Sequence, residues 1–161
     1  MEKRHIGFEL HVHASEAGLS PEDRRLLAAA RQALEGAYAP YSHFRVGAAL
    51  RLDSGETVIG SNQENASYPS GLCAERVAVF QAGARFPGIP IQVIAIVARS
   101  VGDALQTPAA PCGNCRQAIL EYEGRQTHPI RLLLQAGQGV IYECPSMAAL
   151  LPLGFDGSYL S

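Results

Sequence analysis

The stretch at residues 91–100, "IQVIAIVARS", places the strongest constraint on the fold of this chain. It is apolar almost throughout and rich in β-branched residues, which is typical of a strand that is buried on both faces. A sheet that contains such a strand needs a covering layer on each side. The stretch therefore predicts a central strand in a sheet that lies between layers of helices.

A first helix is expected over about residues 21–37. Ser20 supplies an N-cap hydroxyl, Pro21 suits the first helical position, and the acids that follow favour the positive end of the helix dipole. The other elements follow from their patterns: a hairpin from "FRVGAALRL" and "ETVIGSN", a helix over about 73–84, a helix from "CGNCRQAILEYEG", strands "IRLLLQ" and "VIYEC" joined by "AGQG", and a short helix "SMAALLP". A polar loop is expected between 100 and 111. Helices thus alternate with strands, which predicts an α/β fold of three layers, α/β/α.

The N-terminal residues 1–19 alternate apolar and polar side chains, with the strand period of two. They predict an extra edge strand or an arm ahead of a single catalytic domain at 20–161. His11 and His13 would share one face of that strand, as metal-binding histidines do. A solvated face is the preferred interpretation, because no third ligand lies nearby in the sequence.

Composition excludes several classes of function. Of the 161 residues 47% are hydrophobic and 17% are charged, which is typical of one globular domain. The net charge is -2 and Lys and Arg form no run, so neither a nucleic-acid track nor a polybasic membrane patch is expected. No apolar stretch approaches the roughly 20 residues that span a bilayer. The N-terminus lacks the apolar segment of a signal peptide, so the cytoplasm is the expected compartment.

Four cysteines in a cytoplasmic chain indicate metal binding or catalysis more than disulfides. Cys144 has no partner at a recognisable spacing and is interpreted as a small buried hydrophobe. In "PCGNC", Cys112 and Cys115 would project from one face of a helix and can hold one ion together. A redox dithiol and half of a zinc ribbon are the alternatives. A ribbon needs a second Cys-x-x-Cys, however, and a redox motif leaves Cys73 unexplained.

Cys73 completes a set of three thiols. Catalytic zinc sites keep three protein ligands and leave the fourth position to water. Cys73 and Cys112 both begin predicted helices, where the dipole stabilises negative charge and lowers the pKa of a thiol. The sequence therefore predicts a Zn²⁺ site at Cys73, Cys112 and Cys115.

Glu75 follows Cys73 by two positions, which turns it to a different face of the helix. It is thus poorly placed as a ligand and well placed as a general base beside the activated water. Three thiolates donate more charge to zinc than three imidazoles and weaken its effect on the pKa of water. Arg76 and the two helix N-termini are the candidates for compensating positive charge. The alternative for Arg76 is an exposed helix residue.

"CAE" at 73–75 followed by "PCGNC" at 111–115 matches the three-cysteine form of the zinc nucleobase deaminase signature. With "APYSHFRVGAAL", "GSNQENASYPSG" and "LLPLGF", the chain from about 25 to 155 resembles the small homotetrameric cytidine deaminases. The resemblance implies hydrolytic deamination of cytidine and 2′-deoxycytidine in pyrimidine salvage. It also implies a three-layer fold with a mixed five-stranded sheet, one Zn²⁺ per subunit, and a cytoplasmic homotetramer whose active sites are shared between subunits, without nucleic-acid or membrane partners.

The resemblance also assigns roles by motif position. Cys73, Cys112 and Cys115 correspond to the zinc ligands, and Glu75 to the group that carries protons to ring N3 and to the leaving amino group. Asn62 and Glu64 match the pair that binds the ribose 3′-hydroxyl, Phe44 matches the aromatic residue on the pyrimidine, and Ala74 belongs to the substrate-binding set. Ala66 and Tyr68 are implied to reach the 5′-hydroxyl in a neighbouring subunit's site, and Phe155 to close an adjacent site. Arg76 and Gln117 resemble the residues that hydrogen-bond the thiolates.

Simpler alternatives exist for some of these residues: Phe44 and Phe155 as core residues, and Asn62 as a turn cap. The chain also departs from the family pattern in its arm and at Arg45, which stands where many members have Pro and puts a cation beside Phe44 at the expected substrate entrance.

Four other functions compete with the cytidine deaminase interpretation. A blasticidin S deaminase shares the chemistry but is expected to lack the full "NQENASYP" run and to carry Tyr at position 155. Deaminases of tRNA or single-stranded DNA use His at position 73 and need a basic channel. A structural zinc module fills all four metal positions with Cys or His. A protein that only binds pyrimidine nucleosides is the remaining alternative.

Overall fold

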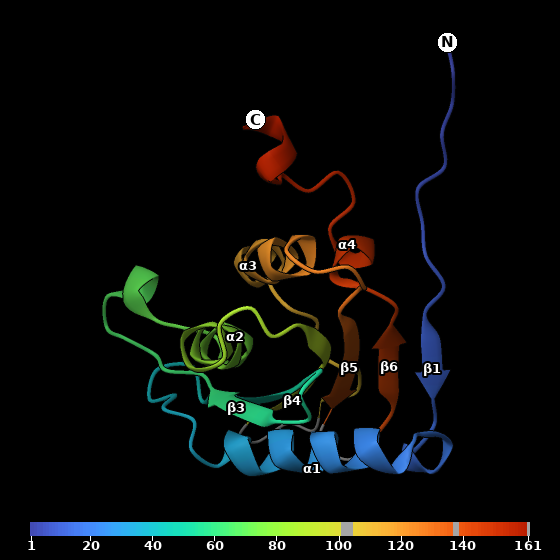
Figure 1. The fold of residues 1–161 in the computed structure, drawn as a ribbon. Helices are drawn as coiled ribbons and strands as arrows, with labels where there is room; N and C mark the ends of the chain where they lie inside the picture. The colour runs from blue at the N-terminus through green and yellow to red at the C-terminus, as the bar shows by residue number, and fades with distance from the viewer. Residues whose placement is uncertain (101–104, 137–138, 161) are drawn as a thin grey trace.

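The computed structural model describes residues 1–100, 105–136 and 139–160. Its six strands are β1 (His11–His13), β2 (Phe44–Leu52), β3 (Thr57–Ser61), β4 (Ile91–Ser100), β5 (Arg131–Ala136) and β6 (Ile141–Cys144). Its four α-helices are α1 (Pro21–Leu34), α2 (Ala74–Arg85), α3 (Gly113–Gly124) and α4 (Met147–Leu150). In Figure 1, α1 lies below the sheet and the other three helices lie above it. The predicted three-layer α/β/α fold is confirmed.

β4 lies inside the sheet, between β2, to which it is antiparallel, and β5, to which it is parallel. Val93, Ala95 and Val97 belong to the hydrophobic cluster under α1. Ile94 and Ile96 belong to the cluster on the side of α2 and α3. Because a fully buried side chain of this size contributes about 1.5–3 kcal/mol, both layers depend on this strand. The prediction of a central strand covered on both faces is confirmed.

The sheet has six strands, in the order β1-β6-β5-β4-β2-β3, where the resemblance implied five. The additional strand is β1 from the N-terminal segment, which pairs antiparallel with β6 through the register His11 to Glu143 and His13 to Ile141. β6 has an open edge beyond β5, and β1 satisfies the hydrogen-bonding groups of that edge. Residues 1–10 precede β1 without regular structure and extend away from the sheet (Figure 1).

Local sequence signals set the start of α1. The Ser20 hydroxyl accepts a hydrogen bond from the backbone N–H of Asp23 at 3.1 Å, and Pro21 occupies the first turn, as expected. The helix ends at Leu34, three residues before the expected end, and Gly36 follows closely in a turn. Parts of the expected 100–111 loop and 136–139 connection lie outside the described residues. None of the helices in the described segments is long and apolar enough to cross a bilayer.

Gly60 on β3 allows the N-terminus of α2 to lie against the sheet. A Cβ atom at this position would stand 2.5 Å from the Ala74 carbonyl oxygen and 2.6 Å from the Ala78 backbone nitrogen. Both contacts are with backbone, which cannot turn aside as a flexible side chain can. The absence of a side chain at Gly60 therefore fixes where α2 begins, and with it the residues that open this helix.

Candidate active site

Three thiols meet where α2 and α3 begin. Cys73 is the N-cap of α2, Cys112 is the N-cap of α3, and Cys115 lies in the first turn of α3. Their sulfur atoms all lie within 4.8 Å of one another, and the Cys112 and Cys115 sulfurs are 3.5 Å apart. The structure thus brings together the three metal ligands predicted from the sequence.

Neither N-cap thiol is used to cap its helix. Ser, Thr, Asp and Asn at this position normally bond to a backbone N–H of the first turn, whereas Cys73 and Cys112 make no such side-chain bond. Their sulfurs are therefore available to a shared ligand. The positive ends of two helix dipoles also meet at the cluster and favour the anionic form of the thiols.

The Cys73 and Cys115 thiols interact through a hydrogen bond. A hydrogen bond from Cys115 lowers the pKa of the Cys73 thiol to about 5, and the Arg76 guanidinium adds to this effect against the cost of burial. The same bond, together with burial, raises the pKa of Cys115. Of the two thiols, Cys73 therefore loses its proton more readily.

Arg76 supplies the compensating positive charge. Its Nη2 donates to the Gly71 carbonyl oxygen at 3.4 Å, and its charge acts on the Cys73 and Cys115 thiols. Its Nε is buried and has no hydrogen-bond partner among the described residues. A buried donor next to sulfur is satisfied when the sulfur is a thiolate. Three clustered thiols beside such a donor fit a zinc ion, which binds thiolates in tetrahedral sites.

Glu75 lies in the first turn of α2 and is only 4% exposed. Burial raises the pKa of its carboxyl group, and the negative charge of Cys73 raises this pKa further. A carboxyl group with a raised pKa holds a proton more readily, which suits a group that accepts and returns a proton during catalysis. It lies beside the thiols and outside the three-sulfur cluster, and its role as a general base stays a prediction.

A pocket of about 340 Å³ opens onto two of the three thiols, those of Cys73 and Cys112. Six of the predicted site residues line it: Asn62, Glu64, Tyr68, Cys73, Arg76 and Cys112. The sequence did not identify the other residues of its lining: Tyr41, Ser42, Gln63, Asn65, Gly71, Leu72 and Asn114. Asn114 stands inside the Cys-x-x-Cys motif and Ser42 follows Pro40 in a turn, so both positions carried a local signal.

Asn62 ties the first residues of β2 to the pocket. Its Oδ1 accepts from the Val46 backbone N–H at 2.8 Å, and its Nδ2 donates to the Phe44 carbonyl oxygen at 2.9 Å. An amide group has one further lone pair and one further hydrogen available. Asn62 can thus hold the strand and still contact a ligand.

Glu64 holds the neighbouring turn. Its Oε2 accepts from the backbone N–H groups of Tyr41 at 2.9 Å and Ser42 at 3.3 Å, and its Oε1 accepts from the Ser42 hydroxyl. The bond from Ser42 lowers the pKa of the Glu64 carboxyl group. Glu64 is therefore an ionised acceptor fixed at the edge of the pocket.

Four of the predicted substrate-binding residues lie outside the lining of this pocket. Phe44 is half-buried at the start of β2, and Ala74 is fully buried at the start of α2. Ala66 is exposed, and Phe155 is 56% exposed with its ring stacked on Tyr159 at 5.4 Å. The exposure of Ala66 and Phe155 leaves them accessible to another molecule.

Gln117 connects α3 to the C-terminal segment. Its Nε2 donates to the Phe155 carbonyl oxygen at 2.8 Å, whereas the sequence predicted a bond to the thiolates. Its neighbour Arg116, which sequence reasoning missed, donates to the carbonyl oxygens of Pro111 and Leu150, both at 2.7 Å. Arg116 directly follows Cys115, and that adjacency was the available signal. The two residues join the metal-binding loop to the end of the chain.

Arg45 does not stand at the entrance of the pocket. Phe44 and Arg45 are consecutive residues of a strand, so their side chains lie on opposite faces of the sheet. Arg45 shares the α1 side with Ala49, and its Nη1 lies 3.8 Å from the Glu35 Oε2. The Arg45 guanidinium, which was expected beside the substrate entrance, lies instead on the α1 side of the sheet, near Glu35.

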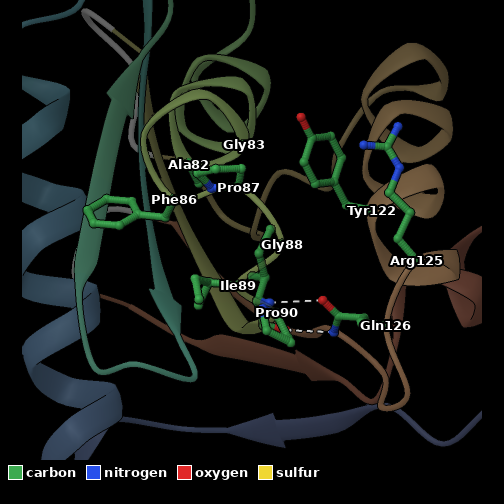
Figure 2. Close-up of a pocket in the computed structure, with 11 residues that line it drawn as sticks. Ala82, Gly83, Phe86, Pro87, Gly88, Ile89, Pro90, Tyr122, Arg125 and Gln126 are labelled. Atoms are coloured by element: carbon green, nitrogen blue, oxygen red, sulfur yellow. Dashed lines mark hydrogen bonds between the residues drawn. The ribbon is translucent and has the colours of Figure 1, made fainter.

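A second pocket, of about 220 Å³, lies at the C-terminal ends of α2 and α3. Figure 2 shows Tyr122 and Arg125 on one side of it and Ala82, Gly83 and Phe86 on the other. Gln126 closes one end by bonding the backbone N–H and carbonyl of Ile91, both at 2.9 Å. No Cys, His, Asp or Glu is among the described residues that line it, and its polar side chains are those of Tyr122, Arg125 and Gln126.

Comparison with known proteins agrees with this geometry. Residues 20–128 match the model of the cytidine and deoxycytidylate deaminase zinc-binding region. The chain is 42% identical over 137 residues to a cytidine deaminase of Halalkalibacterium halodurans, which covers 83% of this chain and 94% of that protein. It is 39% identical over 140 residues to a cytidine deaminase of Sporosarcina psychrophila, covering 85% and 93%. The solved cytidine deaminase from Burkholderia pseudomallei superposes with a TM-score of 0.72 at 42% identity, covering 82% of this chain and 98% of that one.

Proposed function

We propose that this chain, which belongs to the cytidine and deoxycytidylate deaminase family, converts cytidine and 2′-deoxycytidine to uridine and 2′-deoxyuridine with release of ammonia. One observation carries the proposal: three thiols lie within 4.8 Å of one another next to a buried carboxyl group of raised pKa, and two of these thiols, Cys73 and Cys112, line a pocket. The pocket volume of about 340 Å³ is within the range of small-molecule sites, as a nucleoside requires.

Cys73, Cys112 and Cys115 would hold one Zn²⁺ per subunit and leave the fourth position to water. When bound, zinc lowers the pKa of its water toward neutrality and so supplies the nucleophile. Arg76 offsets part of the negative charge of the thiolates, which would otherwise weaken that effect. Zinc binds thiolates, so any proton that these thiols carry is released when the metal binds.

Glu75 moves the protons of the reaction. Its carboxylate accepts one proton from the water and delivers it to ring N3, which makes C4 electrophilic. The oxygen of the water then bonds to C4. Glu75 takes the second proton to the amino nitrogen, the C4–N bond breaks, and ammonia leaves. The sum is one nucleoside and one water giving one uridine nucleoside and one ammonia, with Glu75 returned to its starting state.

The polar groups of the pocket orient the nucleoside. Glu64 is fixed by the Tyr41 and Ser42 backbone and keeps a lone pair on Oε1, with which it would accept the ribose 3′-hydroxyl. Asn62 would use its remaining amide hydrogen in the same contact. Phe44 would pack on the base, and Ala74 would contribute to the base site from the start of α2.

The assembly is proposed to be a homotetramer that shares its active sites. Tyr68 is 74% exposed and Phe155 is 56% exposed, which is unusual for large aromatic side chains unless a partner covers them. Ala66 and Tyr68 would reach the 5′-hydroxyl of a nucleoside in a neighbouring subunit, and Phe155 would close an adjacent site. The enzyme would act in the cytoplasm on free nucleosides in pyrimidine salvage.

The test is ammonia release by the purified protein from cytidine, 2′-deoxycytidine, cytosine, blasticidin S and a cytosine-containing oligonucleotide. We expect turnover of the first two substrates only. Turnover of blasticidin S with both nucleosides inert would assign the alternative function and overturn the proposal. Turnover of the oligonucleotide alone would overturn it as well.

A further inference from the structure

We propose that His11, His13 and Glu143 form a second metal site, for one divalent cation of the zinc class, at the junction of β1 and β6. The site would lie apart from the thiol cluster and would fasten the N-terminal segment to the sheet. Imidazole and carboxylate groups are established zinc ligands, and two histidines with one glutamate make a recurring ligand set.

The register of the two strands brings the three side chains to one face. His11 lies directly opposite Glu143, and His13 lies opposite Ile141. Side chains two residues apart on a strand project from the same face, and so do residues that are directly paired. Ile141 belongs to the hydrophobic cluster under α1, which identifies that face. The third ligand that the sequence lacked near the two histidines is thus supplied by β6.

One carboxylate oxygen lies between the two imidazoles. The His13 Nε2 is 2.8 Å and the His11 Nδ1 is 3.9 Å from the Glu143 Oε2. In a tetrahedral zinc site with bonds of about 2.0–2.2 Å, ligand atoms stand roughly 3.3–3.5 Å apart. One contact therefore lengthens and the other shortens by about half an ångström on binding. Among the described residues the three cysteines of the thiol cluster alone already form a compact group of metal-ligating atoms, so this site requires the His11 side chain, which is 66% exposed, to turn toward His13 when the ion binds.

Arg131 orients the Glu143 carboxylate so that one oxygen faces the histidines. Its Nη1 donates to the Glu143 Oε1 at 2.8 Å and leaves Oε2 to the histidines. Its Nη2 is held by both oxygens of Asp23, at 2.9 and 2.8 Å. Burial opposes ionisation of Glu143, but its bonds to His13 and Arg131 hold the pKa of its carboxyl group below the usual value. Glu143 is thus an ionised ligand, and the nearby guanidinium makes the site weaker than the thiolate site.

The bound ion would act as a fastener. β1 is three residues long and pairs with β6 alone, so few contacts hold residues 1–10 to the domain. Ligands from both strands would tie β1 to β6, and an ion that binds only the folded junction stabilises it by mass action. The other interpretation is a solvated ion pair between His13 and Glu143 that has no affinity for metal.

The experiment counts zinc bound per chain by the untagged, full-length protein at neutral pH, by titration with Zn²⁺ against a chromophoric chelator. We expect two sites in the wild type, one tight and one weaker, and only the tight site in the double variant His11→Ala, His13→Ala. The matched control is His128→Ala, which removes a histidine that also pairs with a carboxylate, Asp53 at 3.0 Å. It should retain both sites. A single site in the wild type, or two in the double variant, would overturn the proposal.

A second measurement separates metal binding from a general loss of β1. Amide hydrogen exchange at residues 11–13 should slow when Zn²⁺ is added to the wild type and should not respond to Zn²⁺ in the double variant. An equal response in both proteins contradicts the site. Deaminase activity should be unchanged in the double variant, because these residues lie outside the pocket at the thiols. The zinc count and the hydrogen exchange therefore test the second metal site whether or not the protein deaminates cytidine.

Discussion

The Gln117 Nε2 donates a hydrogen bond to the Phe155 carbonyl oxygen, 2.8 Å away. The helix that carries Cys112 and Cys115 therefore also holds the C-terminal segment, and Phe155 is placed by the same element that places two metal ligands. This contact links the helix of the thiol cluster to an exposed aromatic ring.

Replacing Gln117 with Leu tests this link. The loss of one hydrogen bond of about 0.5–1.5 kcal/mol should lower kcat/KM for cytidine by roughly 2–10-fold, because Phe155 is held less firmly. Zinc content per chain should be unchanged. Steady-state kinetics and metal analysis of the same preparation measure both. A loss of zinc would instead show that Gln117 acts mainly on the thiolates.

Arg116 should be more costly to replace. Arg116→Met removes charge-assisted bonds to the Pro111 and Leu150 carbonyls, both at 2.7 Å, and leaves two acceptors without a donor. We expect the free energy of unfolding to fall by about 2–4 kcal/mol. We also expect a lower affinity for zinc, because Pro111 directly precedes the predicted ligand Cys112. Urea unfolding and zinc competition measure these effects. If the variant were as stable as the wild type, Arg116 would not stabilise the fold through the Pro111 and Leu150 carbonyls.

Gly60→Ala should shift the start of α2. Its Cβ would stand 2.5 Å from the Ala74 carbonyl oxygen, so the helix must move away from β3. Overpacking of this kind costs about 1–3 kcal/mol, and the shift should also lower zinc affinity through Cys73. Gly124→Ala is the matched control, since nothing lies within 4 Å of a Cβ there. If the two variants were equally stable, the absence of a side chain at Gly60 would not determine the position of α2.

The pair of His128 and Asp53 predicts a pH-dependent contribution to stability. The hydrogen bond to Asp53 raises the pKa of His128, and the same bond lowers that of Asp53. The His128 contribution is fully present below its unfolded pKa, about 6.5, and is lost as pH rises through the higher folded value. His128→Asn should therefore lower Tm more at pH 5.5 than at pH 8.5. Thermal unfolding at the two pH values checks this, and an equal shift at both would contradict it.

The sequence was sufficient for the fold class and for the metal centre, because each rests on local spacing. Apolar periodicity predicted the central strand at 91–100, and the positions of Cys73, Cys112 and Cys115 at helix starts predicted the cluster. The same helical geometry placed Glu75 beside the cluster, and its catalytic role stays a prediction. The strand and the helix starts depend on residues that are close together in the chain. The grouping of the three cysteines depends on the number of protein ligands that a catalytic zinc ion takes.

Features that depend on pairing between distant segments escaped sequence reasoning. The alternation of apolar and polar side chains predicted a strand within residues 1–19. It did not predict that His11 would lie opposite Glu143, because such a strand can pair with either open edge of the sheet. The direction of Arg45, by contrast, was available from the sequence: it follows Phe44 on a strand and therefore points to the other face. Gln117 and Glu64 bond to backbone that comes near only in the folded chain.

The measurement that tests the central claim most directly is turnover and zinc content of Glu75→Gln against the wild type. The amide keeps the shape of the side chain but cannot accept the proton, and proton transfer by a positioned group is worth about 10²–10⁴-fold in rate. The variant should hold one zinc in the thiol cluster and release ammonia from cytidine at least about 100-fold more slowly. Undiminished turnover, or loss of that zinc, would contradict the assignment of Glu75 as proton carrier and not as ligand.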